Sequence, residues 1–171
     1  MDIFRGAERL MAMDDAAWRR HANPWSGYTR MVTVLPLLML AIWSRVWLGW
    51  WALIPVGLAL GWVWLNPRLF AEPKRFDSWM SKGVLGERIF IEHRASLPDH
   101  QLRMARILAF ASAPGVVLMI WGLWSLWWEA AVFGALLGVI PKIWFVDRMV
   151  WIFHEWRAEG RPVPGMHDDE L

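Results

Sequence analysis

The chain has 171 residues, of which 57% are hydrophobic, and it contains 16 tryptophans and no cysteine. The length suits one domain, and the lack of cysteine excludes disulfides, iron–sulfur clusters and cysteine nucleophiles. The net charge is only +2, because 18 basic residues are offset by 16 acidic ones, so nucleic-acid binding is not expected. Tryptophan is enriched at membrane interfaces, and this composition indicates an integral membrane protein.

Residues 1–20 predict an amphipathic helix that lies in the plane of the membrane interface. Ile3, Ala7, Leu10 and Met11 recur at helical spacing, and charged residues stand between them. The segment has no continuous apolar core and no small-residue cleavage site, so it is not a signal peptide.

The polar stretch 19–30 precedes the first apolar run. Asn23-Pro24 and Ser26-Gly27 are turn signals, which favour a simple linker. The functional alternative is a polar lid over the mouth of a helix bundle, with His21 as an acid or base.

Four apolar runs are predicted to be membrane-spanning helices, since a span needs about 20 mostly apolar residues. They cover 29–47, 50–66, 103–126 and 130–153. Short tips join them into two hairpins, 29–66 and 103–156. The expected fold is therefore an all-α, integral membrane four-helix bundle that forms a single membrane domain over 1–171.

The segment 67–102 between the hairpins is polar and is predicted to connect them on the cytoplasmic side. Within it, the two glycines of GVLGER (83–88) predict a turn, because the spacing of a nucleotide-binding loop is missing. Residues 157–171 form a polar tail.

The basic residues predict the orientation of the chain. Of 18 Lys and Arg, only Arg45 lies at a hairpin tip. Because cytoplasmic loops carry the excess of Lys and Arg, both termini and 67–102 are expected to be cytoplasmic, in a prokaryotic cytoplasmic (inner) membrane. The eight tryptophans at the two tips are expected to form an aromatic belt.

Two Gly-x-x-x-Gly pairs predict close packing of helices. They are Gly57/Gly61 in the second predicted helix and Gly134/Gly138 in the fourth. Small residues four apart let two backbones approach closely, so these helices are expected to cross at the glycines, either within one chain or between two.

The stretch KIWFVDRMVWIFHEW (142–156) carries charges at the end of an apolar run. At about 1.5 Å per residue from Ala130, Lys142 lies roughly 18 Å into a hydrocarbon core of about 30 Å. Asp147 and Arg148 then lie near the inner boundary, and His154 lies beyond it. Most of these charges therefore mark the helix leaving the membrane.

Asp147 at the boundary needs a partner. Arg148 points about 100° away on a helix and is a poor candidate, so Arg30 or Arg68 is expected to pair with it. Together with Lys142 these residues predict a basic cluster around one acid. The basic residues of the cluster, which form the lipid- or anion-binding candidates, are Arg30, Arg68, Lys142 and Arg148. Such a cluster holds a lipid phosphate or, alternatively, is a structural ion-pair network.

Four residues are catalytic candidates by residue type alone: His21, Glu87, Asp147 and His154. No nucleophile, nucleotide or zinc motif occurs. None of the five histidines lies in the apolar interior, so a haem held between membrane helices is not expected. We expect no metal site and no cofactor.

Four segments carry a family resemblance: RRHANPWSGYTR (19–30), WLNPRLF (64–70), SKGVLGERI (81–89) and KIWFVDRMVW (142–151). In these segments the chain resembles a family of small, uncharacterised prokaryotic membrane proteins, a domain of unknown function. The resemblance covers most of the chain and implies a compact four-helix membrane unit. It implies no activity and transfers no catalytic residue.

Three functions remain open. The first is a non-enzymatic binding or accessory component of a membrane complex, in contact with lipids and with a membrane-protein partner or a second copy. The second is a small membrane-embedded enzyme acting on a lipid or apolar substrate at the cytoplasmic interface. Its support is a set of polar residues at one mouth: His21, Asn23, Arg30, Asn66, Arg68, Glu87, Arg88, Asp147 and His154. The third, a transporter or channel, ranks last because four spans are few for a pathway. Convergence of these side chains on one pocket would favour the enzyme, and dispersal would favour the accessory role.

Overall fold

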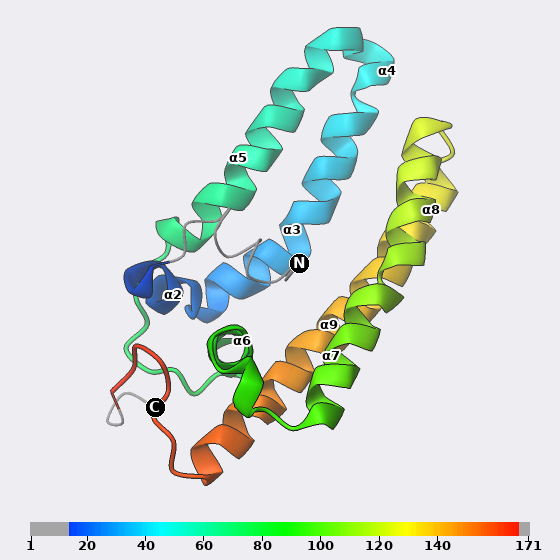
Figure 1. Cartoon of the computed structure of the whole chain (residues 1–171). Helices are drawn as coiled ribbons and strands as arrows, with labels where there is room; N and C mark the ends of the chain where they lie inside the picture. Colours follow the sequence, from blue (N-terminus) through cyan, green and yellow to red (C-terminus); the bar gives the residue numbers. More distant parts are fainter. Residues whose placement is uncertain (1–13, 168–171) are drawn as a thin grey trace. The chain divides into compact units, whose positions relative to one another are not determined.

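The computed structural model describes residues 14–167, and every regular element in that range is helical (Figure 1). The all-α prediction is confirmed. Most of the predicted N-terminal interfacial helix, residues 1–13, lies outside the described residues. Its remaining residues fall on α2, which begins at Asp15 and has its own N-cap at Asp14. The elements are α2 (Asp15–His21), α3 (Pro24–Trp43), α4 (Arg45–Leu48), the 3-10 helix η1 (Gly49–Ala52), α5 (Leu53–Leu69), α6 (Trp79–Glu92), the 3-10 helix η2 (Arg94–Ser96), α7 (Asp99–Ala111), α8 (Ala113–Trp124) and α9 (Trp128–Ala158).

Three helical stretches of the described chain are long and apolar enough to cross a membrane. They are Pro24–Asn66 with 43 residues, Asp99–Trp124 with 26 and Trp128–Ala158 with 31. Length and composition are thus compatible with a membrane protein, as predicted.

The first apolar helix begins earlier than its hydropathy suggests. The side-chain oxygen of Asn23 accepts a bond from the Trp25 backbone N–H at 2.9 Å, and Pro24 takes the first helical position. Both are start signals for a helix. The predicted linker turn at Ser26-Gly27 is therefore wrong, because these residues lie inside α3.

The turn predicted at GVLGER is also wrong, since residues 83–88 lie in the middle of α6. Ser78 caps this helix by accepting a bond from the Ser81 backbone N–H at 3.0 Å. Ten of its 14 residues are buried. The connecting segment thus contains a core helix.

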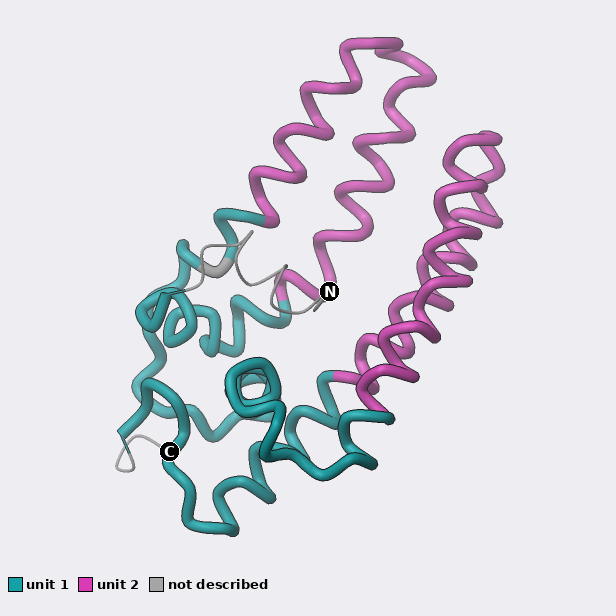
Figure 2. Tube along the Cα trace, viewed as in Figure 1, with its two compact units in different colours: residues 1–28, 64–103, 146–171 teal, residues 29–63, 104–145 magenta. Residues whose placement is uncertain are grey.

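The described chain divides into two compact units (Figure 2). Unit 1 comprises residues 1–28, 64–103 and 146–171, and unit 2 comprises 29–63 and 104–145. These units cut across the segments predicted from hydropathy, because each of α3, α5, α7 and α9 runs from one unit into the other.

Unit 2 is held together by close helix contacts and a small core. Its buried centre is formed by Met39, Met119, Leu123 and Ala131, with Trp43 packed against it. The indole N–H of Trp62 donates to the Thr33 hydroxyl at 2.9 Å, which joins α5 to α3.

Arg45 links the tip of α3 to the end of α8. One of its guanidinium nitrogens donates to the carbonyl oxygens of Leu123 and Trp124, both at 2.6 Å. These carbonyls have no partner within the helix. The basic residue at the tip is therefore used to cap a helix C-terminus.

The glycines of α9 pack against α8. A Cβ on Gly134 would overlap the backbone of Met119, and one on Gly115 would overlap that of Gly138. In contrast, a Cβ on Gly57 or Gly61 would meet nothing within 4 Å. The predicted crossing of the second and fourth helices at their glycines is wrong within the chain, and a contact between chains stays a prediction.

Unit 1 is built around α6. A Cβ on Gly86 would overlap the backbone carbonyl of Met149 on α9, so α6 and α9 touch backbone to backbone. At the start of α6, Met80 fills the space above Gly27 of α3. The hydroxyl of Ser81 donates to the Ala22 carbonyl at 2.7 Å. These contacts bury α6 among segments that are distant in the sequence.

Candidate functional site

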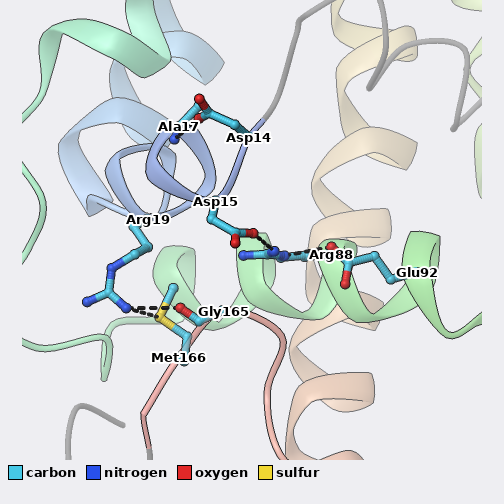
Figure 3. Close-up of polar contacts among 8 residues, drawn as sticks. All are labelled: Asp14, Asp15, Ala17, Arg19, Arg88, Glu92, Gly165 and Met166. Carbon is cyan, nitrogen blue, oxygen red and sulfur yellow. Dashed lines mark hydrogen bonds and ion pairs between the residues drawn. The ribbon is translucent and has the colours of Figure 1, made fainter.

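The most concentrated group of charged side chains in unit 1 surrounds Arg88 (Figure 3). Arg88 lies on α6 and is only 4% exposed. Its Nη2 contacts the carboxylate of Asp15 on α2, and its Nε donates to Glu92 at 2.8 Å, one helical turn further on. The guanidinium lies 6.0 Å from the centre of the Trp18 ring. A buried cation is thus balanced by two acids, as burial of a charge requires.

The Nη1 atom of Arg88 is the exception in this group. It is inaccessible to solvent and has no hydrogen-bond partner among residues 14–167. Gly165 lies against it, because a Cβ built on this glycine would overlap Nη1. Gly165 also has a φ of +66°, which favours glycine.

A second arginine, Arg19 on α2, binds the same C-terminal segment. Its Nη1 donates to the Gly165 carbonyl at 2.9 Å and contacts the Met166 sulfur at 3.6 Å. Its other nitrogens pair with Glu72. Arg19 thus binds this segment from α2, and Arg88 of α6 lies against the same segment at Gly165 (Figure 3).

His21 is buried at the other end of α2, in a line of polar side chains. Its Nδ1 lies 3.2 Å from the Ser26 hydroxyl, which donates to Oδ1 of Asn66 at 3.1 Å. Ser26 and Asn66 are fully buried. This line joins α2, α3 and α5 within unit 1.

The direction of these bonds decides what His21 can do. A hydroxyl has one hydrogen, and Ser26 gives it to Asn66. With the Ser26 hydrogen on Asn66, the tautomer of His21 that carries its hydrogen on Nδ1 donates to the Ser26 oxygen.

Asp147 has different partners from those expected. Its carboxylate contacts Nη2 of Arg148 at 3.3 Å and the indole N–H of Trp79 at 3.4 Å. The expectation that Arg148 is a poor partner is wrong, because its long side chain bends back to its neighbour. Arg68 instead donates to the Trp64 carbonyl at 2.6 Å and lies 4.0 Å above the Trp64 ring.

The other candidates belong to both units. His154 is exposed on α9, and Glu87 is partly buried on α6. Arg30 and Lys142 belong to unit 2, whereas Arg68 and Arg148 belong to unit 1. Lys142 is exposed, with its ammonium 4.6 Å from the Phe145 ring centre. A common cluster of the four basic residues therefore stays a prediction.

Within the described range, no three His, Asp or Glu side chains are gathered as a metal ion would require. Sequence reasoning placed Arg88 and Asn66 at a polar mouth but gave no partner for either. Asp15 is 73 residues from Arg88 and Ser26 is 40 from Asn66, so only the fold pairs them.

Comparison with known proteins identifies the family. Residues 5–165 match the "Family of unknown function (DUF6653)", so the chain belongs to that family. No match was found among curated proteins or among solved structures.

Proposed function

We propose that this member of the DUF6653 family is a polytopic membrane protein that acts as a non-enzymatic binding or accessory component of a membrane complex. In this proposal unit 2 is the membrane anchor and unit 1 is the binding part. The observation that carries it is the use of the polar side chains in unit 1. Arg88, His21, Ser26 and Asn66 are buried, and their polar contacts join α2, α3, α5 and α6 within unit 1.

The membrane arrangement that we propose has four spans in two hairpins, in a prokaryotic cytoplasmic membrane. The stretch Pro24–Asn66 has 43 residues, about twice the length that one span needs. The Thr33–Trp62 bond joins its two halves, which supports a hairpin. The distribution of the basic residues supports a cytoplasmic position for unit 1 and both termini.

The surface of unit 2 supports its role as an anchor. Large apolar side chains are exposed along α5 and at the tip, where Trp50 is 88% exposed and Leu58 of α5 is 71% exposed. Water would make such a surface costly, at about 25 cal/mol per Å² of apolar area, whereas lipid tails would not. We propose that membrane lipids cover it.

Site-specific photo-crosslinking tests whether unit 1 binds a protein and unit 2 contacts lipid. A photoreactive residue replaces exposed Lys74 of unit 1 in one variant and exposed Leu58 of unit 2 in the other. We expect a discrete protein adduct from position 74 in intact cells and lipid adducts from position 58. The binding role would be contradicted if position 74 gave no protein adduct.

The enzyme remains the second candidate because of one observation, the buried line from His21 through Ser26 to Asn66. The purified chain and its Ser26→Ala variant would be reconstituted in vesicles made from the host's lipid extract. We expect the two lipid profiles to be the same by mass spectrometry. A product formed by the wild type and not by the variant would establish the enzyme and overturn our proposal.

A further inference from the structure

The described part of unit 1 ends in the segment 161–166, which we call the strap and which closes in a turn, because the Met166 N–H donates to the Val163 carbonyl at 3.1 Å. α9 stops at Ala158, and Gly160 takes a φ of +70°. The Gly160 N–H donates to the Arg157 carbonyl at 3.0 Å and the Arg161 N–H to the Trp156 carbonyl at 3.3 Å. This pair of bonds is a Schellman motif, which reverses the chain after a helix. The strap therefore turns back along unit 1.

Side chains of unit 1 donate hydrogen bonds to the backbone of the strap. The indole N–H of Trp156 on α9 donates to the Pro162 carbonyl at 2.9 Å, and Arg19 on α2 donates to the Gly165 carbonyl at 2.9 Å. One strap side chain, Val163, is buried, with 2% exposed. Side-chain donors on backbone carbonyls, with one apolar side chain buried between them, combine backbone hydrogen bonds with a side-chain pocket, as in peptide recognition.

The strap fits this surface incompletely. It places Gly165 against Arg88 but gives Nη1 of Arg88 no acceptor, although that atom is inaccessible to solvent. A buried donor without an acceptor is unfavourable, and a different occupant that supplied an acceptor there would remove that cost. A segment that supplies an acceptor to Nη1 of Arg88 would therefore compete with the strap for this surface.

Charge decides which kind of occupant suits the surface. Arg88 is already balanced by Asp15 and Glu92, and Arg19 by Glu72. A phosphate would meet these three carboxylates, whereas a neutral carbonyl oxygen would not be repelled by them. The chemistry favours an uncharged peptide backbone over an anion.

We infer that the strap covers a peptide-recognition surface of unit 1, and that a partner protein displaces it with a segment that forms the same turn and carries a small aliphatic residue two positions before a glycine. The motif follows from Val163, whose side chain is buried, and from Gly165, where a side chain would overlap Arg88. This inference rests on the binding role proposed above and names the chemistry of the partner.

The test makes the strap exchangeable in the folded, full-length protein. A site for a specific protease is inserted between Gly160 and Arg161, the chain is purified in detergent, and the site is cut. A fluorescent peptide with the sequence of residues 161–171 is then added, and its anisotropy is measured. We expect saturable binding to the cut protein, and binding at least about tenfold weaker to the uncut protein, because the tethered strap competes at a high effective concentration.

Matched controls use the features that define the motif. A peptide with Val163→Asp and a peptide with Gly165→Ala should each bind at least about tenfold more weakly than the native peptide, since one charges a buried side chain and the other overlaps Arg88. Unlabelled native peptide should displace the probe, and 10-fold excess inorganic phosphate should not. Failure of the native peptide to bind the cut protein, or displacement by phosphate, would overturn the inference.

A second variant covers the case in which cutting unfolds the protein. In the uncut chain, Val163→Asp weakens the strap in place, so the labelled native peptide should bind this variant and not the wild type. If the Val163→Asp variant still unfolds cooperatively but does not bind the labelled peptide, the inference is overturned. A dimer formed by strap exchange, detected by size-exclusion chromatography, would also overturn it. The crosslinking from position 74 is independent of the strap, so a failure here would leave the binding role standing.

Discussion

In unit 1 the guanidinium of Arg88 is buried against Trp18 and two carboxylates, while in unit 2 the indole of Trp50 is 88% exposed. Glycine differs in a similar way at two positions: Gly86 of unit 1 touches the backbone of α9 and Gly57 of unit 2 faces open space, although Gly134 of unit 2 packs on α8. We propose that water surrounds unit 1 and lipid surrounds unit 2, because a buried charge and an exposed tryptophan suit these different solvents.

The largest expected effect comes from Gly86→Leu. A leucine side chain there would collide with the Met149 carbonyl, which belongs to the backbone and cannot rotate away. We expect a loss of about 3 kcal/mol or more in the free energy of unfolding, measured in detergent. Gly57→Leu is the matched control and should unfold like the wild type. If the two variants are equally stable, Gly86 does not make the close backbone contact that distinguishes it from Gly57.

Gly134→Leu probes a close contact inside unit 2. The new side chain would overlap the backbone of Met119 on α8. We expect a loss of about 2 kcal/mol, because helix contacts in lipid depend on such close approach. Thermal unfolding in detergent measures it, with Gly61→Leu as the control on the open side of α5. An unchanged melting temperature for Gly134→Leu would argue against the α8–α9 contact.

Arg88→Met tests the buried charge of unit 1. The change removes the cation from two carboxylates, of which Asp15 is mostly exposed and Glu92 one-third exposed, so solvent reduces the cost. We expect a loss of about 1–2 kcal/mol by thermal unfolding. Arg75→Met, in the same unit and 83% exposed, should change stability by less than about 0.5 kcal/mol. If Arg75→Met lowers the free energy of unfolding as much as Arg88→Met, the buried Arg88 charge does not stabilise unit 1.

The smallest effect is expected at Asp147. Its pair with Arg148 joins side chains that are 40% and 36% exposed. A double-mutant cycle with Asp147→Asn and Arg148→Gln should give a coupling below about 1 kcal/mol. Asp147→Asn and Arg68→Gln should be additive. A coupling above about 1 kcal/mol between Asp147 and Arg68 would instead support the pair that the sequence predicted.

How much the sequence predicts differs between the two units. Apolar runs locate α3, α5 and α9 to within five residues at each end, and the predicted span 103–126 covers most of α7 together with α8, because hydropathy acts locally. The helix α6 is missed because Gly83 and Gly86 read as turn residues, although both are required by close contact with α9. A local signal was present in Ser78, which caps α6, and in apolar residues at helical spacing such as Leu85 and Ile89.

The polar partners could not be predicted, because they depend on tertiary folding. Arg88 and Asp15 are brought together by α2 packing on α6, and no pattern in either segment names the other. Asp147 shows the opposite error. Helical geometry alone argues against its neighbour Arg148, yet the flexible arginine side chain reaches it.

Cysteine labelling of the intact membrane tests the central claim, that unit 2 is the anchor and unit 1 lies in the cytoplasm. The chain has no cysteine, so single replacements at Ser44 and Ser125 of unit 2 and at Ser96 of unit 1 need no altered background. With a membrane-impermeant thiol reagent, we predict that positions 44 and 125 react from outside intact cells. Position 96 should react only after the cells are opened. Labelling of position 96 in intact cells, with positions 44 and 125 protected until lysis, would contradict the account.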